Sequence, residues 1–449
     1  MPARAELLEM ITRPDVFEQP RQLVEGLQLE AARELFRERI EQIPVLSRRA
    51  KDTGVDEIRS LNDIVPLVFA HTAYKSYPQT FVDEGRWDQM LRWLNTLSVE
   101  DTTNVDVTDV KDVDDWLTRL HEVGHLVLAT TGSTGKCSFL NQTVGDHKSK
   151  ARHYSRTYGW PTQTPNQDRP FFAVSPSRGF NGAIEVTLII AEQWARPGAK
   201  YFLTDEPLRI REVSQMAALR KRMAEGSATP NEIRSAEESA ADRAEDMKIA
   251  LRQMAARLVE CRREPIFIIA QWAQHLMLIE AAKAMGVKDG EFHRDSIWVA
   301  GGGIKGVTMP ADYKERVKLF YAGTQQRTGY GMTEVAQRMP RCEANRYHCT
   351  PGLILLPLDQ LGERLLSPTN GDGTVVEGRF ACLDLLFEGR WGGVISGDRV
   401  TVDYSAICPC GRPGPTILDN VSRFTQIGLD DHIGCAGTID SYIKGIMSQ

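Results

Sequence analysis

The sequence lacks long hydrophobic runs and has little charge imbalance. No stretch approaches the about twenty consecutive apolar residues of a membrane-spanning helix, and residues 1–20 contain no apolar segment typical of a signal peptide. The formal net charge is only −6 over 449 residues, so the basic excess typical of proteins that bind nucleic acid phosphates is missing. These absences predict a cytoplasmic protein with neither membrane nor nucleic acid as a partner.

Cysteine is also scarce. Eight cysteines in 449 residues are too few for a disulfide framework. In a reducing compartment, clustered thiols more often bind a metal or take part in chemistry than form a crosslink. The hydrophobic content of 42% and the charged content of 25% are ordinary for a globular protein, and the length allows a large buried core.

The order of sequence patterns predicts an α/β fold. Residues 1–100 have helical apolar spacing. Short apolar runs predict strands at 171–176, 266–270 and 296–303, and helical patterns follow the last two. Strands that alternate with helices indicate a largely parallel sheet. The Ala-, Glu- and Arg-rich insert 205–263 predicts a pair of solvated helices, and strand patterns return after Glu377.

The segment from His121 to His125 matches the H-E-x-x-H motif of zinc proteases. That motif requires both histidines on one helix face, with the glutamate as general base. Here the apolar helical spacing ends before Gly124, which suits a position just after a helix end. We therefore predict that His125 begins a strand, and we interpret the motif as a chance match.

A glycine- and hydroxyl-rich loop follows, TTGSTGK at 130–136. It is not a Walker A loop, because Thr130 stands where the first glycine belongs and Cys137 where Ser or Thr belongs. Two glycines, three hydroxyls and a lysine can nevertheless direct donors at one anion. A plain glycine turn is the alternative.

Two later segments decide between these interpretations. GYGMTE at 329–334 and GDRV at 397–400 follow the loop in order. The ordered set resembles the adenylate-forming superfamily, which contains acyl-CoA synthetases, acyl-protein synthetases and stand-alone adenylation enzymes. The resemblance spans roughly residues 115–435. VAGGGIKG at 299–306 is similar to acyl-protein synthetases, and CPCGRPGP at 408–415 is similar to phenylacetate–CoA ligases.

The resemblance implies an adenylation domain over 1–418, with helix-flanked mixed sheets and a C-terminal strand-rich subdomain. Residues 419–449 resemble the hinge and first element of a mobile domain that is mostly absent. The implied reaction is ATP-dependent activation of a small carboxylic acid to an acyl-adenylate with release of pyrophosphate. Transfer to a thiol or amine acceptor would follow, with a carrier or partner protein as one alternative and homodimerisation left open.

The resemblance also implies roles for individual residues. The loop would hold the β- and γ-phosphates, Tyr330 would lie along adenine, and Asp398 would accept the ribose hydroxyls. Thr333, Glu334 and Lys136 are the implied catalytic residues, with Glu334 as the ligand of Mg²⁺, which prefers carboxylate oxygens. The implied nucleotide-binding residues are Thr131, Gly132, Ser133, Thr134, Gly135, Lys136, Gly301, Gly302, Gly303, Tyr330, Gly331, Met332, Thr333 and Asp398.

Two cysteine pairs predict a structural zinc site. Cys342 and Cys349 follow the GYGMTE segment, and Cys408 and Cys410 follow the GDRV segment. Four thiolates would form a closed tetrahedral site that joins two distant segments. The resemblance leaves His348 as an alternative to Cys349, and buried free thiols are the alternative to any metal.

Several features stay open at this level. Cys435 is either an acyl-accepting nucleophile or a free thiol, and Lys444 stands in the wrong context for the lysine of the mobile domain. Phe171, Phe172, Phe180 and Arg178 are either parts of an acyl pocket or ordinary core and surface residues. The alternative to an enzyme is a non-catalytic nucleotide-binding module, stabilised by zinc, that needs a partner.

Overall fold

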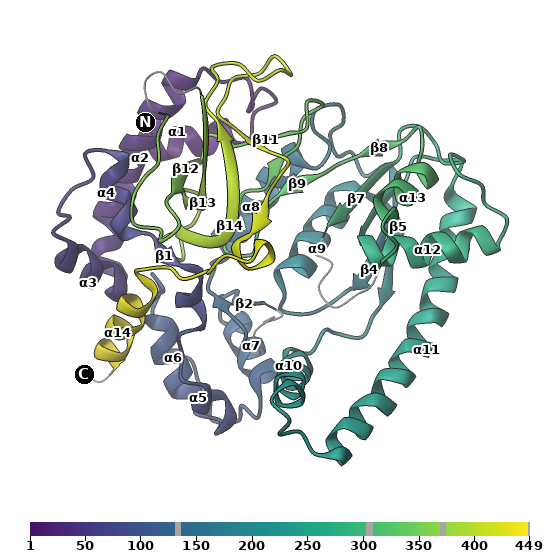
Figure 1. The fold of residues 1–449 in the computed structure, drawn as a ribbon, viewed down its shortest axis with the longest axis horizontal. Coiled ribbons are helices and arrows are strands. Elements are labelled where there is room, and N and C mark those ends of the chain that lie inside the picture. Colours follow the sequence, from purple (N-terminus) through teal and green to yellow (C-terminus); the bar gives the residue numbers. More distant parts are fainter. Residues whose placement is uncertain (131–135, 302–308, 369–373, 448–449) are drawn as a thin grey trace. The chain divides into compact units, whose positions relative to one another are not determined.

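A computed structural model of the chain describes residues 1–130, 136–301, 309–368 and 374–447 (Figure 1). The chain forms two compact units. Unit 1 contains residues 1–130, 137–157 and 329–449, and unit 2 contains residues 131–136 and 158–328. The two units are described separately below.

Unit 2 is built on a sheet of five parallel strands in the order β5-β4-β6-β7-β8. The strands are β4 (Arg169–Pro176), β5 (Ala195–Thr204), β6 (Phe267–Gln271), β7 (Ile297–Gly301) and β8 (Gln325–Gln326). Three of them coincide with the predicted apolar runs. Strands buried on both faces need apolar residues at every position, which is why they appear as short continuous runs.

Helices connect these strands, as βαβ units require. They are α9 (Gly182–Trp194), α10 (Ile210–Ala224), α11 (Pro230–Cys261), α12 (Trp272–Ala284) and α13 (Tyr313–Phe320). The C-terminal part of α11 packs into the core through Leu251, Met254 and Leu258. Its first half is exposed, so α10 and α11 confirm the prediction of two largely solvated helices.

The N-terminal part of unit 1 is helical, as its spacing predicts. The helices are α1 (Ala3–Met10), α2 (Arg21–Gln42), α3 (Pro44–Thr53), α4 (Leu61–Ile64), α5 (Gln79–Asp83), α6 (Trp87–Asn95), α7 (Val113–Glu122) and α8 (Val144–Thr157). Asp112 caps α7 by accepting hydrogen bonds from Asp114 and Asp115. Helix α7 ends at Glu122, and Gly124 adopts a φ of 94°, a conformation that favours glycine.

A seven-stranded mixed sheet forms the rest of unit 1. Its order is β11-β15-β14-β13-β12, and both β1 (Phe69–Ala70) and β16 (Ser422–Arg423) also pair with β14. The long strands are β12 (Leu353–Leu358), β13 (Val375–Asp384) and β14 (Gly393–Asp403), and the short ones are β11 (Arg346–His348) and β15 (Thr416–Leu418). All pairs are antiparallel except β1 with β14, which is parallel. The predicted α/β fold class with mixed sheets is therefore confirmed.

The C-terminal segment packs against the same sheet. Arg379 of β13 is fully buried; it donates to Asp431 at 2.6 Å and lies over the Phe424 ring at 4.2 Å. Helix α14 (Ala436–Met447) contacts α3 and β1. A buried guanidinium needs partners for its donors, so Arg379 fixes this segment on unit 1. The predicted domain boundary at 418 stays a prediction.

None of the helices in the described ranges combines the length and the apolar character needed to cross a bilayer.

Candidate functional site

The predicted phosphate-binding residues fall largely outside the described ranges. Thr131, Gly132, Ser133, Thr134 and Gly135, together with Gly302 and Gly303, are not among the described residues. Lys136 is half-buried, and Gly301 is an exposed residue at the C-terminal end of β7. Ligands of parallel sheets bind beyond the C-terminal strand ends, so the position of Gly301 agrees with its predicted role, which stays a prediction.

Tyr330 and Asp398 are brought together in unit 1. Tyr330 lies on β9 (Gly329–Tyr330), which pairs with β10 (Met339–Pro340). Its hydroxyl donates to Asp398 Oδ2 at 2.8 Å, and its ring packs edge-on against Phe380 with a centroid distance of 5.1 Å. Burial and the Asp398 carboxylate raise the pKa of Tyr330 well above its usual value. The phenol therefore stays protonated and donates to the carboxylate.

Asp398 also has a cationic neighbour, Arg423. Strand β16 pairs with β14 through Asp398 and Arg423, and the Arg423 guanidinium lies 3.4 Å from Asp398 Oδ1. The preceding residue, Gly397, allows a close approach of the C-terminal segment, because a Cβ there would lie 2.6 Å from Asp431 Oδ2. The Asp398 side chain is 15% exposed, so it can still meet a ligand from solvent.

Thr333 and Glu334 are held through their backbone carbonyls. Arg390 is almost fully buried, and its Nη2 donates to Glu334 O at 2.9 Å, with Thr333 O at 3.5 Å. The guanidinium also donates to Asn141 O at 3.1 Å and lies over the Phe387 ring at 3.8 Å. Because Arg390 fixes the main chain, the half-buried side chains of Thr333 and Glu334 are left available for other contacts.

The turn after Glu334 is organised by a buried carboxylate. Asp384, at the end of β13, accepts hydrogen bonds from the Ala336 and Gln337 amides at 2.8 and 3.2 Å and from the Gln337 side chain at 2.7 Å. Burial raises the pKa of Asp384, and these hydrogen bonds oppose that effect. Neither Asp384 nor Arg390 belongs to a motif, so no sequence signal indicated the role of either residue.

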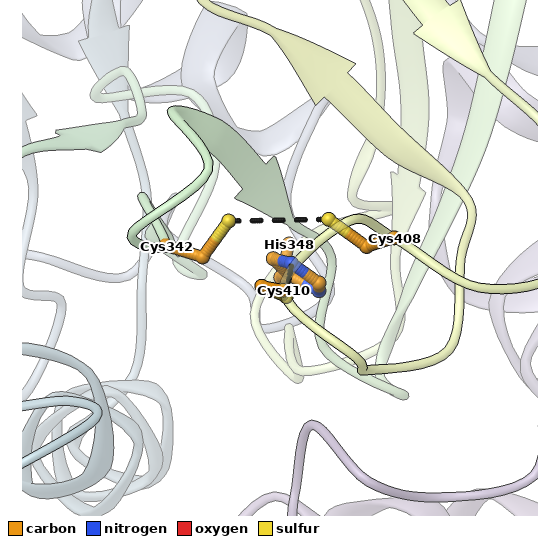
Figure 2. A group of neighbouring side chains, drawn as sticks. All are labelled: Cys342, His348, Cys408 and Cys410. Atoms are coloured by element: carbon orange, nitrogen blue, oxygen red, sulfur yellow. Dashed lines mark hydrogen bonds between the residues drawn. The ribbon is translucent and has the colours of Figure 1, made fainter.

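Unit 1 also contains a second constellation, formed by Cys342, His348, Cys408 and Cys410 (Figure 2). We call these four residues the Cys/His cluster. Two tight backbone turns position them. In the first turn, the Cys342 amide donates to Arg346 O at 2.9 Å and Asn345 adopts a φ of 57°. Strand β11 then leads from the turn to His348.

The second turn connects β14 to β15. The Cys408 amide donates to Arg412 O at 2.8 Å. Within this turn Gly411 has a φ of 87°, a backbone conformation that favours glycine. Arg412 pairs with Glu343 at 3.0 Å and so connects the two turns. Because β11 and β15 are antiparallel, His348 at the end of β11 lies opposite Thr416, the first residue of β15, which follows the second turn.

The distances within the Cys/His cluster suit one tetrahedral metal ion. The candidate ligand atoms all lie within 4.8 Å of one another. Cys342 Sγ is 4.0 Å from Cys408 Sγ, and Cys410 Sγ is 3.4 Å from His348 Nε2 (Figure 2). Ligands at zinc–sulfur and zinc–nitrogen bond lengths in a tetrahedron are about 3.5–3.8 Å apart, and these two separations lie within a few tenths of an ångström of that range.

The electrostatics of the Cys/His cluster also suit a metal. Burial, with the Arg412 charge, lowers the pKa of His348 to about 4, which keeps the imidazole neutral, as ligation requires. Burial opposes ionisation of Cys410, but hydrogen bonds from the Arg412 backbone and side chain and from the thiols of Cys408 and Cys342 lower its pKa. Burial raises the pKa of Cys408 to about 12, so without a cation these thiols do not all ionise.

The two alternatives for the fourth ligand, His348 and Cys349, lie in different places: His348 belongs to the Cys/His cluster, and Cys349 lies outside it. The Cys349 sulfur is 3.7 Å from Met339 Sδ and packs against the core of the sheet. Burial raises the pKa of Cys349 to about 12. Neighbouring strand residues point to opposite faces, so one of the adjacent pair His348 and Cys349 must face away.

The H-E-x-x-H residues do not form a zincin site. His121 is in α7, and its Nε2 lies 2.9 Å from Val127 O, whereas His125 lies beyond the helix end with Nδ1 3.7 Å from Glu100. Glu122 is exposed. This arrangement agrees with the interpretation of the motif as a chance match.

The other open residues resolve mostly toward structural roles. Phe171 and Phe172 are fully buried on β4 and stack on Phe267 and Tyr201, at 5.4 and 5.0 Å. Arg178 donates to the carbonyl of Asp205 at 2.7 Å. Cys435 is buried, and burial raises its pKa, which disfavours a thiolate nucleophile. Lys444 is exposed on α14.

Comparison with solved structures defines the class of fold. The chain resembles an open conformation of 2-hydroxyisobutyryl-CoA ligase in complex with 2-HIB-AMP and CoA, with a TM-score of 0.55, 14% identity, and coverage of 91% of this chain and 72% of that chain. It also resembles the postadenylation state of that ligase in complex with 2-HIB-AMP, with a TM-score of 0.51, 13% identity, and coverage of 90% and 68%.

The chain therefore has the fold of an adenylate-forming acyl-CoA ligase, and the predicted resemblance is confirmed at the level of the fold. Protein-family profiles give no match, and no curated protein matches the sequence.

Proposed function

We propose that the protein activates a small carboxylic acid as an acyl-adenylate, using ATP and releasing pyrophosphate. The observation that carries this proposal is the pairing of Tyr330 with Asp398 beside a backbone-anchored Thr333–Glu334 segment in a chain with this fold. Asp398 would accept the ribose hydroxyls, since an ionised carboxylate can accept two hydrogen bonds at once. Tyr330 would lie along the base.

The chemistry needs positioning and charge neutralisation more than proton transfer. The substrate carboxylate attacks the α-phosphorus, the bond to the bridging oxygen breaks, and its electron pair leaves with pyrophosphate. Thr333 would donate to the α-phosphate, and Lys136 with the other loop residues would hold the outer phosphates. Bound to Glu334, Mg²⁺ would neutralise phosphate charge.

Zinc would have a structural role in the same unit. The Cys/His cluster supplies four ligands, which leaves no open position for a substrate. It joins the segment after Glu334 to the segment after β14, so a bound zinc ion would stabilise the arrangement of the two predicted nucleotide-binding segments. Its removal should therefore affect stability first and activity second.

Thioester formation with a thiol acceptor is the second step that the solved CoA-bound neighbour supports; an amine acceptor is the alternative. A non-catalytic nucleotide-binding module remains the competing function.

The test is pyrophosphate release from ATP with hydroxylamine as the trap, over aryl, fatty, hydroxy and amino acids. Release with one class of acid supports adenylation and identifies the substrate class. If ATP binds but no acid stimulates release, the binding module is the correct function. Coenzyme A in place of hydroxylamine then distinguishes a thiol acceptor from an amine acceptor.

A further inference from the structure

A short turn from the N-terminal part of the chain enters the region of the predicted nucleotide-binding residues. Strand β1 pairs in parallel with β14 through Phe69 with Val394 and Ala70 with Ile395 (Figure 1). The chain then forms the 3-10 helix η2 (His71–Lys75). Parallel pairing directs η2 toward the part of β14 that carries Asp398, and η2 indeed contacts β14.

Two further contacts anchor this turn. Tyr74 lies under the Arg390 guanidinium at 5.5 Å, and Arg390 is the residue that binds the Glu334 carbonyl. Tyr77, just after the turn, donates to Cys137 O at 2.9 Å, and Cys137 is the first residue after the predicted phosphate loop. Lys75 therefore lies between two anchored residues, Tyr74 and Tyr77, on a turn that contacts β14.

The charges around Lys75 come from the same region. Burial lowers the pKa of Lys75, whereas the carboxylates of Glu334 and Asp431 raise it and the Arg423 charge lowers it. Burial lowers the pKa of His71, the charge of Lys75 lowers it further, and the same two carboxylates raise it. The half-buried ammonium of Lys75 therefore interacts electrostatically with the predicted magnesium ligand Glu334. This environment suits an anion that carries its own metal ion.

Polar atoms next to Lys75 also lack partners. His71 Nδ1 and Thr72 Oγ1 are buried and find no hydrogen-bond partner among the described residues. Buried polar atoms are nearly always satisfied by protein, water or ligand. The two atoms on η2 are thus available to a polar ligand or to water beside this turn, and this observation does not depend on the charges around Lys75.

We propose that Lys75 is a catalytic residue that binds an α-phosphate oxygen of ATP beside Glu334. This inference rests on the proposed adenylation. During attack of the carboxylate on phosphorus, the ammonium donates a hydrogen bond to the oxygen on which negative charge increases. Lys75 stays protonated throughout this step. The pyrophosphate leaves with the electron pair of the broken bond between phosphorus and oxygen. A purely structural lysine that pairs with Glu334 is the alternative.

The experiment compares three variants by acid-dependent pyrophosphate release and by thermal unfolding. Lys75→Met removes the charge and keeps the aliphatic stem, and Lys75→Arg keeps the charge. Lys51→Met is the matched control, because Lys51 is an exposed lysine on α3. We expect kcat of Lys75→Met to fall about 100-fold, as for removal of one transition-state donor. The KM for ATP should rise by a smaller factor, because the contact to the bound phosphate is also lost.

Lys75→Arg should recover part of this loss, while Lys51→Met should match the unsubstituted protein and all variants should keep its unfolding temperature. If Lys75→Met retains kcat within about 3-fold, or if kcat falls only together with the unfolding temperature, the proposal is wrong.

A failure of adenylation itself is recognised separately. If the unsubstituted protein releases no pyrophosphate with any acid, calorimetric titration with MgATP replaces the kinetic assay. Weaker binding by Lys75→Met than by Lys51→Met then supports a phosphate contact. Equal binding by the two variants overturns it.

Discussion

The Cys/His cluster and the predicted nucleotide site formed by Tyr330, Thr333, Glu334 and Asp398 lie in one unit but differ in completeness. The cluster brings four ligand atoms within 4.8 Å of one another from two tight turns. In the nucleotide site, Arg390 anchors the main chain at Glu334. The Asp398 carboxylate accepts a hydrogen bond from Tyr330 and lies 3.4 Å from Arg423, so its oxygens contact protein groups.

This difference has a physical consequence. The ligands of a closed metal site converge only in the folded protein. The free energy of metal binding therefore adds to the free energy of unfolding. A substrate site needs exposed groups that exchange protein contacts for ligand contacts. Substitutions in the cluster should therefore mainly change stability, and substitutions in the nucleotide site should mainly change turnover.

The largest effect is expected from loss of a cluster ligand. Cys408→Ser should lower the zinc content from about one ion per chain to near zero. The unfolding temperature should fall by about 10 °C or more, since structural zinc binding contributes several kcal/mol or more to folding. Elemental analysis and calorimetry measure both effects.

Cys349→Ser is the matched control, because this thiol lies one residue from His348 but outside the cluster. It should keep the zinc ion, whereas His348→Ala should lose it. Retention by His348→Ala together with loss by Cys349→Ser would reverse our assignment of the fourth ligand.

Neutralising Asp398 should produce the largest effect on turnover. Asp398→Asn keeps the shape of the side chain but removes the charge and one acceptor. We expect acid-dependent pyrophosphate release to fall about 100-fold, with an unfolding temperature close to that of the unsubstituted protein. Glu377→Gln, which changes another carboxylate on the same sheet, should leave the rate unchanged; equal losses in both variants would make the effect non-specific.

Arg390→Met should affect both properties. The variant loses the hydrogen bonds to the carbonyls of Glu334 and Asn141. A hydrogen bond from a charged donor contributes about 1.5–3 kcal/mol, so the free energy of unfolding should fall measurably. Because Thr333 and Glu334 lose their anchor, the Mg²⁺ concentration needed for half-maximal rate should rise. A stability loss without any change in Mg²⁺ dependence would limit Arg390 to a structural role.

Tyr330→Phe is expected to have the smallest effect. The ring still packs on Phe380, and only the hydroxyl that donates to Asp398 is lost, at a cost of about 1–3 kcal/mol. The KM for ATP should change more than kcat, because the lost hydroxyl donates to Asp398, the predicted ribose ligand, and not to a reacting group. Steady-state kinetics would contradict this if kcat fell as far as in Asp398→Asn.

Parts of this molecule could be predicted from local sequence. The buried strands β4, β6 and β7 appear as short apolar runs because both faces of a parallel sheet are covered. The end of α7 follows from apolar spacing and Gly124. Of the four cysteines predicted as zinc ligands, Cys342, Cys408 and Cys410 come together in the Cys/His cluster, whereas Cys349 does not.

Other features could not be predicted because they depend on long-range packing. The choice between His348 and Cys349 is decided by which face of β11 turns inward, and a three-residue strand gives no periodicity from which to read it. Arg390 and Lys75 act on residues far away along the chain. Their sequence surroundings, EGRWGG and TAYKSY, contain no motif that would indicate this.

The most direct test of adenylation is acid-dependent exchange of labelled pyrophosphate into ATP, because exchange reports the reversible first half-reaction without any acceptor. We predict exchange with one class of carboxylic acid, strongly reduced in Asp398→Asn and unchanged in Glu377→Gln. Bound ATP without exchange for any acid, or exchange that persists undiminished in Asp398→Asn, would contradict the proposed function or its site.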